Sequence, residues 1–440
     1  MPKKKLSVIG LGKLGACYAA FYASKGYSVL GYDINEANVS LLNEGLAPVN
    51  EPGLAELIKR NSERISATTE LGRLIAETDL TFIILPTPSR KDGLFSVDYI
   101  LSAAQAIGHH LNKKDGYHVF VLVSTVLPGN SHELIIPAFE KHSGKKHGEH
   151  FGYAYSPSLI AIGDILNNLE NPDFVFLGAP EGPAREAVRE IYENIYKGQK
   201  PIEQMNIESA ELAKISLNSY VTMKITFANI LGELCSKLPY ADVDEITTTL
   251  GKDRRIGKAY LRAGLGYGGT CFPRDNFAFA AMAKKLGVET PIALATHNLN
   301  DGIWKKTLSL IRKSAAKPKD VIGILGISYK PNTTLSEESQ ARFITEKLVS
   351  LKHPILLYEP MGHHDAKRVF GGKVSYAKSL KDTLKKSDVI FVSNNDKLFI
   401  TIPEILKNTK TKKTIIDSWG MFTQKDFNKH VTYISPGRKK

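Results

Sequence analysis

The N-terminal part of the chain contains the run Leu6-Ser7-Val8-Ile9-Gly10-Leu11-Gly12-Lys13-Leu14-Gly15, and its pattern predicts the local fold. A strand-like run leads directly into glycines spaced Gly-x-Gly-x-x-Gly, and a helix-like pattern continues from them through Lys25. Such glycines permit a tight turn, close approach of a pyrophosphate group and close packing of the helix on the strand. Free N–H groups at the start of the helix would face the phosphates. The pattern therefore predicts a dinucleotide-binding turn formed by Gly10, Gly12, Lys13, Leu14 and Gly15.

An acidic residue stands where such a turn needs one. A second strand-like run, Tyr27–Tyr32, ends at Asp33, about 20 residues after the turn, where a carboxylate accepts the ribose hydroxyls of a dinucleotide. The same carboxylate would repel a 2′-phosphate, so we expect NAD rather than NADP as the cofactor.

Two further turns follow buried strand-like runs, at Leu85–Pro88 and at Ser124–Val126. Both are expected at the carboxyl edge of the sheet, where open α/β folds bind their ligands. The alternative for both is ordinary strand-ending turn chemistry. The cofactor-binding candidates at these turns are Thr87, Pro88, Ser124 and Thr125.

The alternation of strand and helix patterns predicts an α/β fold class with two Rossmann-like, doubly wound domains joined by a long central helix. Residues 1–200 would form the dinucleotide-binding domain, residues 201–313 a helical connector and dimerisation region, and residues 314–440 the second α/β domain. The long helix is expected from Ile207 to about Lys237, where apolar residues recur at helical spacing. The expected strands are Leu6–Leu11, Tyr27–Tyr32, Leu80–Leu85, Val119–Val123, Phe174–Leu177, Val321–Ile327, Ile355–Tyr358, Val389–Val392 and Thr414–Ile416, and the helices of the second domain are Glu338–Ser350 and Ser379–Ser387.

Composition and charge limit the class of protein. A 42% hydrophobic share and a 23% charged share are typical of a globular chain, and no apolar run reaches the ~20 residues of a membrane helix. The basic start Met1–Lys5 lacks the apolar stretch of a signal peptide, so we expect a cytoplasmic protein without a membrane partner. The net charge of +13 fits either solvated lysines or attraction of anionic ligands. Nucleic acid is not expected as a partner because no basic stripe is interleaved with aromatics, and the end Arg438-Lys439-Lys440 is expected to be solvated.

The three cysteines, Cys17, Cys235 and Cys271, are too few and too scattered for a disulfide framework or a structural zinc site, and no metal is expected.

Cys271 lies in the segment Gly264-Leu265-Gly266-Tyr267-Gly268-Gly269-Thr270-Cys271-Phe272-Pro273-Arg274-Asp275. Four glycines in six residues let the backbone approach a ligand closely. The neighbouring Arg274 favours the thiolate, which is the reactive form. Cys271 is therefore a candidate nucleophile, and the alternative is a small buried apolar residue.

These motifs, in this order and spacing, resemble the UDP-glucose/GDP-mannose dehydrogenase family, most closely its UDP-glucose 6-dehydrogenase branch. The matching stretches cover nearly the whole chain and are Gly10–Gly15 with Asp33, Glu51-Pro52-Gly53-Leu54, Thr87-Pro88, Ser124-Thr125, Ala210-Glu211-Leu212-Ala213-Lys214 with Asn218, Asp253–Gly257, Gly264–Asp275 and Gly326–Pro331.

The resemblance implies oxidation of a primary alcohol at sugar C6 to a carboxylate with two NAD, by a homodimer acting on a UDP-sugar. It implies that Cys271 traps the aldehyde as a thiohemiacetal, which becomes a thioester that water cleaves. It further implies proton handling and oxyanion stabilisation by Lys214, Asn218 and Asp275, cofactor contact by Arg274, and UDP binding by residues 314–440. The substrate contacts implied are Ser158, Leu159, Ile160, Lys214, Asn218, Arg255, Gly264, Tyr267, Gly268, Tyr329 and Lys330.

The chain departs from the family at several charged positions. Where the family reads Pro-Glu-Phe-Leu-x-Glu-Gly, this sequence has Ser158 and Ile162 in place of the glutamates, the first of which is linked to thioester hydrolysis. Loss of a general base typically costs about 10²–10⁴-fold in rate. Glu337 and Trp419 stand at two family arginine positions.

Three explanations of these departures remain open: another substrate, a slow or redirected second half-reaction, or hydrolysis by another group such as Lys214 through a water. The alternative functions are accordingly a diverged oxidoreductase that uses another sugar or stops after one two-electron oxidation, and a non-catalytic NAD- or nucleotide-sugar-binding regulator.

Overall fold

The computed structural model describes residues 4–439 and divides into two compact units, Met1–Ser216 and Leu217–Lys440, each of which is described by itself. Residues 1–3 of the basic start and Lys440 of the basic end lie outside the described residues. Within residues 4–439, no helix combines the length and the apolar character needed to cross a bilayer.

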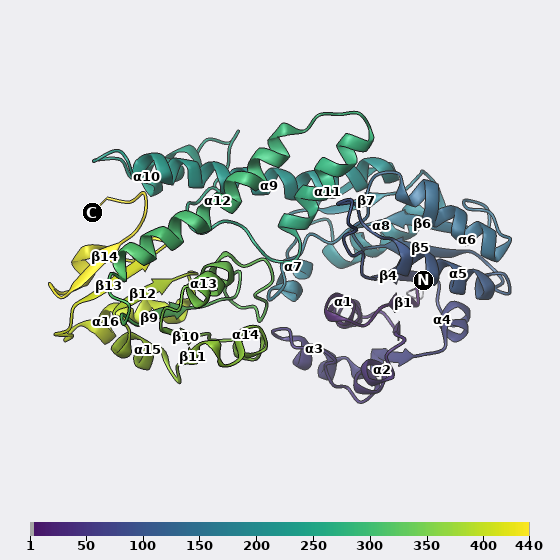
Figure 1. Cartoon of the computed structure of the whole chain (residues 1–440). Coiled ribbons are helices and arrows are strands. Elements are labelled where there is room, and N and C mark those ends of the chain that lie inside the picture. Colours follow the sequence, from purple (N-terminus) through teal and green to yellow (C-terminus); the bar gives the residue numbers. More distant parts are fainter. Residues whose placement is uncertain (1–3, 440) are drawn as a thin grey trace. The chain divides into compact units, whose positions relative to one another are not determined.

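The first unit is built on an eight-stranded sheet with the order β3-β2-β1-β4-β5-β6-β7-β8 (Figure 1). Every neighbouring pair is parallel except β6 with β7, and Leu6 of β1 pairs with both Val29 and Leu80. Its strands are β1 (Leu6–Ile9), β2 (Val29–Tyr32), β3 (Ile65–Thr68), β4 (Leu80–Ile83), β5 (His118–Leu122), β6 (Phe151–Tyr155), β7 (Val175–Gly178) and β8 (Ile202–Met205). Its helices are α1 (Lys13–Ser24), α2 (Glu36–Asn43), α3 (Leu54–Arg60), α4 (Leu71–Glu77), α5 (Asp98–Leu111), α6 (Ile136–Ser143), α7 (Ile165–Glu170) and α8 (Pro183–Tyr196).

The central strands of this sheet are buried on both faces, because helices cover each side. Successive residues of one strand enter opposite clusters: Phe82 packs in the cluster with α1, and Ile83 packs in the cluster with α5. The Tyr22 ring of α1 stacks on Phe82 at 4.5 Å between centroids. Burial on both faces explains why these strands read as continuous apolar runs rather than as alternating ones.

A chain of polar side chains crosses the middle of this sheet. Ser7 Oγ and Thr81 Oγ1 lie 2.7 Å apart, and Thr81 Oγ1 lies 2.7 Å from His118 Nε2. All three residues are fully buried. Burial lowers the pKa of His118 to about 3, so this imidazole is neutral at physiological pH.

The second unit combines helices with a six-stranded parallel sheet of order β11-β10-β9-β12-β13-β14. Its strands are β9 (Ile322–Leu325), β10 (Ile355–Tyr358), β11 (Ser375–Tyr376), β12 (Val389–Val392), β13 (Lys413–Asp417) and β14 (Val431–Ile434). Its helices are α10 (Val243–Leu250), α11 (Phe272–Lys285), α12 (Pro291–Ser314), α13 (Gln340–Ser350), α14 (His363–Phe370), α15 (Leu380–Lys386) and α16 (Ile402–Leu406), together with the C-terminal part of α9 (Ile207–Cys235).

The predicted fold class, with two parallel-sheet Rossmann-like parts and a long central helix, is confirmed by this architecture. The expected helix from Ile207 to about Lys237 is α9, and every expected strand is present within two residues of its predicted ends. One prediction was wrong. Arg438 is not solvated, because its side chain is only 7% exposed and is paired with Asp244.

Candidate active site

The glycine turn after β1 has the shape that a pyrophosphate needs. Gly10 has φ +91°, and a Cβ there would lie 2.3 Å from the carbonyl oxygen of Ile84. A Cβ on Gly15 would lie 1.7 Å from the carbonyl oxygen of Gly10, so this glycine is required for packing of α1 on the turn. A Cβ on Gly12 would meet nothing within 4 Å. The space above Gly12, at the N-terminus of α1, therefore fits the diphosphate of a dinucleotide.

Asp33 lies at this turn, as the sequence predicted. Its Oδ2 accepts a hydrogen bond of 2.7 Å from the amide of Leu11, and its Oδ1 accepts one from the amide of Asn35 at 2.9 Å. Because these bonds fix the carboxylate at the carboxyl end of β2, the residue is positioned to accept ribose hydroxyls. The turn and Asp33 together could hold NAD.

The two turns after β4 and β5 are tied to each other. Ser124 Oγ accepts from the amide of Leu85 at 2.9 Å and donates to its carbonyl at 2.7 Å, and Thr87 Oγ1 donates to the carbonyl of Thr125 at 2.8 Å. The hydroxyls of Ser124 and Thr87 are thus used between the turns. Pro88 is exposed and Thr125 is half-buried on the same pair of turns.

Sequence reasoning assigned no role to Glu211, which anchors this region. The fully buried Glu211 carboxylate accepts from the amides of Gly129 and Ser131, at 2.8 and 3.1 Å, and from the Ser131 hydroxyl at 2.6 Å. Burial raises the pKa of Glu211 to about 7 against the lowering effect of these donors. Glu211 therefore fixes α9 to the segment that follows the Ser124 turn.

The loop after β6 carries Ser158, Leu159 and Ile160, all half-buried. Lys214, one turn of α9 beyond Glu211, is buried and its Nζ donates to the carbonyl of Ser158 at 2.8 Å. Glu51 closes the far end of this loop by accepting from the amides of Gly163 and Ile165. The Lys214 ammonium thus lies against the backbone of Ser158.

Cys271 is the exposed cysteine of the chain and lies at the N-cap of α11. Its Sγ is 3.6 Å from the Thr270 hydroxyl. Cys17 and Cys235 are buried, and burial raises the pKa of both thiols, that of Cys17 to about 12. The accessible thiol that follows the glycine segment is therefore the one suited to react.

Two other predicted catalytic residues meet beside Cys271. Asn218 Nδ2 donates to Asp275 Oδ2 at 2.6 Å, and both side chains are buried. Arg274 Nε donates to Asp275 Oδ1 at 3.2 Å, while the Asp275 amide donates to the carbonyl of Cys271 at 2.8 Å. The second unit thus brings Asn218, Asp275 and Cys271 together at the start of α11.

The glycine loop Gly264–Gly269 is fixed by amide side chains. Asn300 Oδ1 accepts from the Tyr267 amide at 2.9 Å, and Asn300 Nδ2 donates to the Tyr267 carbonyl at 3.0 Å. Gln340 Oε1 accepts from the Gly266 amide at 2.8 Å, and Gln340 Nε2 donates to the carbonyl of Asn300 at 2.8 Å. Both side chains are buried, and neither was singled out from the sequence.

The far end of the loop packs on two segments of the same unit. The Gly269 amide donates to the carbonyl of Glu337 at 3.1 Å, and a Cβ on Gly268 would lie 2.2 Å from the carbonyl oxygen of Glu338. Glu337 therefore holds the loop through its backbone, while its side chain is exposed. The Tyr329 ring lies against Gly269, and Lys330 Nζ lies 5.8 Å from the centre of that ring.

Not every predicted substrate residue joins this group. The Arg255 side chain is 83% exposed and is paired with Asp253 rather than with the glycine loop. Trp419, at a family arginine position, lies against Gly264, where a Cβ would come within 2.8 Å of the indole. This part of the loop therefore lies against an aromatic plane.

The second sheet repeats the turn geometry of the first. The Gly326 amide donates to the carbonyl of Tyr358, as the Gly10 amide does to that of Tyr32, and Gly326 also has a positive φ of +86°. Glu359 stands where Asp33 stands in the first sheet. Its carboxylate accepts from four backbone amides, those of Ile327, Ser328, Met361 and Gly362. Glu359 is therefore a structural anchor for the loop that leads to Tyr329.

Comparison with known proteins matches three family models along the chain. They are the NAD binding domain of the UDP-glucose/GDP-mannose dehydrogenase family at residues 4–196, its central domain at 208–302 and its UDP binding domain at 323–424.

Curated relatives match over nearly their whole length. The UDP-glucose 6-dehydrogenase AglM of Haloferax volcanii is 33% identical over 96% of this chain and 98% of its own. The GDP-mannose 6-dehydrogenase of Pseudomonas aeruginosa is 29% identical over 94% of this chain and 96% of its own.

Among solved structures, a UDP-glucose dehydrogenase from the hyperthermophilic archaeon Pyrobaculum islandicum has a TM-score of 0.88 at 29% identity, covering 99% of this chain and 98% of its own. The chain belongs to the UDP-glucose/GDP-mannose dehydrogenase family and is an NAD-dependent dehydrogenase of a nucleotide sugar.

Proposed function

We propose that this protein oxidises the C6 hydroxyl of a UDP-hexose, UDP-glucose or a close relative, to the uronate through a covalent intermediate on Cys271. The observation that carries the proposal is the exposed Cys271 thiol at the N-terminus of α11, directly after a glycine loop that buried side chains hold in place. The base is taken as uridine because the family's UDP binding domain matches residues 323–424 and because AglM acts on UDP-glucose by its name.

NAD, held by the Gly10–Gly15 turn and Asp33, supplies the hydride acceptor when it is bound. The C6 alcohol would lose a hydride to a first NAD and a proton to a base, which gives the aldehyde. The Cys271 thiolate adds to the aldehyde carbon and forms a thiohemiacetal, which would lose a hydride to a second NAD and give a thioester. Water cleaves the thioester, which releases the carboxylate and returns the thiol.

The neighbouring residues move protons and stabilise charge in this proposal. Asp275, bonded to Asn218 and Arg274, is a proton acceptor and donor near the thiol. The Asn218 amide and the Lys214 ammonium stabilise developing negative charge on the C6 oxygen. Arg274, bonded to Asp275, contributes positive charge at the start of α11.

A second candidate is a single two-electron oxidation that ends at the aldehyde. Ser158 favours it, since a serine cannot act as a carboxylate base at neutral pH, and the group that donates to the Ser158 carbonyl is the Lys214 ammonium. The two candidates differ in the number of NADH formed per sugar, which is two for the full route and one for the shorter route.

We further propose that the protein is a homodimer that uses the exposed face of α9. Tyr220, Phe227 and Leu234 are 56%, 49% and 54% exposed and lie seven residues apart, so they fall on one stripe of the helix. Large apolar side chains in such a stripe are costly to leave in water. Sedimentation of the wild type and of Phe227→Glu tests this, with a dimer and a monomer expected respectively; a monomeric wild type contradicts it.

The experiment for the main proposal combines a panel of UDP- and GDP-sugars with NAD and follows NADH against sugar consumed. We expect two NADH per UDP-hexose, turnover abolished by Cys271→Ala, and turnover retained by Cys235→Ala, which removes a buried thiol. Turnover by Cys271→Ala at the wild-type rate would contradict the cysteine route, and one NADH per sugar would favour the single oxidation.

A further inference from the structure

The residues Ser435–Lys439, which follow β14 and are called the C-terminal strap below, are built into the second unit. Gly437 has φ +77°, and a Cβ there would lie 2.5 Å from the carbonyl oxygen of Gly232 on α9. The Gly437 carbonyl accepts from the Val243 amide at 2.8 Å, at the start of α10. The Lys439 amide donates to Asp242, the N-cap of α10, at 2.9 Å. Backbone contacts with two helices thus fix the strap.

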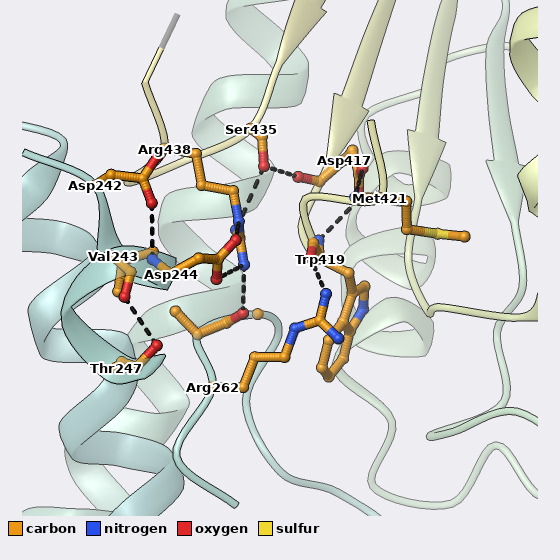
Figure 2. Close-up of polar contacts among 12 residues, drawn as sticks. Asp242, Val243, Asp244, Thr247, Arg262, Asp417, Trp419, Met421, Ser435 and Arg438 are labelled. Carbon is orange, nitrogen blue, oxygen red and sulfur yellow. Dashed lines mark hydrogen bonds and ion pairs between the residues drawn. The ribbon is translucent and has the colours of Figure 1, made fainter. Parts of the chain in front are cut away.

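Arg438 connects the strap to the segment that begins the glycine loop (Figure 2). Its Nε and Nη2 donate to the two carboxylate oxygens of Asp244 at 2.6 and 3.0 Å, and Nη2 also donates to the carbonyl of Ala263 at 3.0 Å. Its Nη1 lies 3.3 Å from the Ser435 hydroxyl. A paired, two-pronged guanidinium has one orientation, so the Ala263 carbonyl is held in one place.

The residues on either side of Ala263 are held as well. Arg262 Nη2 donates to the carbonyl of Trp419 at 2.7 Å, beside the indole in Figure 2, and the Gly264 amide donates to Asn229 Oδ1 at 2.8 Å. The indole itself lies against Gly264 and donates through Nε1 to the Ser393 carbonyl at 2.7 Å.

The turn that carries Trp419 is in turn tied to the strap. Asp417 accepts from the Trp419 and Met421 amides, and the Ser435 hydroxyl donates to the carbonyl of Asp417 at 2.9 Å. Strap, Trp419 turn and residues 262–264 therefore form one bonded cluster.

We propose that Arg438 is a positioning residue for the nucleotide sugar, which acts by fixing Ala263 and Gly264 and, with them, the Trp419 indole. The inference rests on the proposed function in that the Gly264–Gly269 loop contacts the substrate. Without Arg438, residues 262–264 sample other conformations, and substrate binding must select the bound one. The apparent affinity for the nucleotide sugar is then the intrinsic affinity multiplied by the fraction of molecules that hold that conformation.

The kinetic test compares Arg438→Gln, Arg438→Lys and Asp244→Asn with wild type, and Lys439→Gln is the matched control. Lys439 lies next to Arg438, but its side chain makes an exposed pair with Glu245, so its loss leaves the Ala263 contact intact. For Arg438→Gln we expect the KM of the nucleotide sugar to rise about tenfold, with kcat within about threefold and the KM of NAD unchanged, a change equivalent to about 1.4 kcal/mol.

Arg438→Lys keeps the charge but has no rigid fork, so it should restore part of the affinity, and Asp244→Asn should fall near it. A role in overall stability alone would lower the melting temperature and the active fraction without moving the KM of the sugar. An unchanged KM in folded Arg438→Gln and Asp244→Asn would therefore overturn the proposal.

A fluorescence test does not depend on turnover. The chain has two tryptophans, so Trp304→Phe leaves Trp419 as the single tryptophan, whose emission can be excited selectively over that of tyrosine. In that background Arg438→Gln should shift the tryptophan emission to longer wavelength. It should also lower the affinity for uridine diphosphate that is measured by titration, while Lys439→Gln should change neither quantity.

Identical emission with and without Arg438 would overturn the inference even in an active enzyme. The proposed function fails separately, if the wild type oxidises no UDP- or GDP-sugar while the emission shift is still seen.

Discussion

Replacing Asn300 with alanine is expected to weaken nucleotide-sugar binding strongly. In the native chain the Asn300 side chain satisfies both the amide and the carbonyl of Tyr267, at 2.9 and 3.0 Å, and it is buried. A buried backbone group that loses its partner costs about 1–3 kcal/mol. Two such groups give about 2–6 kcal/mol, and a water in the space left by the carboxamide would recover part of it.

About 3 kcal/mol is therefore the expected cost of holding the Gly264–Gly269 loop in its present conformation. If substrate binding must restore that conformation, kcat/KM for the nucleotide sugar falls by up to about 100-fold, mostly through KM. Steady-state NADH formation at varied nucleotide sugar and saturating NAD measures this.

Asn298→Ala is the matched control, because Asn298 is an exposed asparagine two residues away on α12. It should leave kcat and KM within about twofold of wild type. Asn300→Asp keeps the acceptor for the Tyr267 amide but places an oxygen against its carbonyl, so an intermediate loss is expected. A wild-type KM for Asn300→Ala would refute the reasoning that the Tyr267 backbone is held for substrate.

Three further outcomes follow from the first unit. Gly12→Ala should raise the KM of NAD tenfold or more with an unchanged melting temperature, because a Cβ there meets no protein atom within 4 Å. Gly15→Ala should unfold the turn, because its Cβ would lie 1.7 Å from the Gly10 carbonyl oxygen. Equal effects of the two substitutions on the melting temperature would contradict this. Burial raises the pKa of Glu211 from 4.5 to about 7, so the free energy of unfolding falls by about 3 kcal/mol as pH rises through that window. In Glu211→Gln the free energy of unfolding should depend less on pH over the same range. An identical slope in the variant and the wild type would contradict this. Burial lowers the pKa of His118 from 6.5 to about 3, so the free energy of unfolding falls by about 4–5 kcal/mol as pH falls through that window. His118→Leu should therefore lose less of its free energy of unfolding between pH 8 and acid pH than the wild type loses.

Sequence periodicity located the central strands well because helices cover both faces of the sheet. It missed β6, where Gly152 interrupts the pattern; that glycine is needed because a Cβ would lie 2.6 Å from Ala184 on α8. It also missed β8, an edge strand with two exposed residues, whose polar sequence carries no apolar run. Short and edge strands therefore escape a pattern that depends on burial.

The candidate site was predictable where its chemistry is local. The glycine turn, Asp33 and the Cys271 segment are each read from a few adjacent residues. Asn300 and Gln340 were missed because their partners lie 33 and 74 residues away in the sequence and an isolated amide side chain has no motif. Arg438 was misjudged for the same reason, since Asp244 lies 194 residues away and basic residues near an end usually remain in water.

A covalent intermediate on Cys271 can be detected from the mass of the protein during turnover with a UDP-hexose and NAD. We propose that Ser158 stands at the position that the resemblance links to hydrolysis, so the thioester should persist long enough to be seen after acid quenching. We expect an added mass of one oxidised nucleotide sugar, located on the peptide that contains Cys271 and absent in Cys271→Ala. Normal NADH formation by Cys271→Ala with no adduct on the wild type would contradict it.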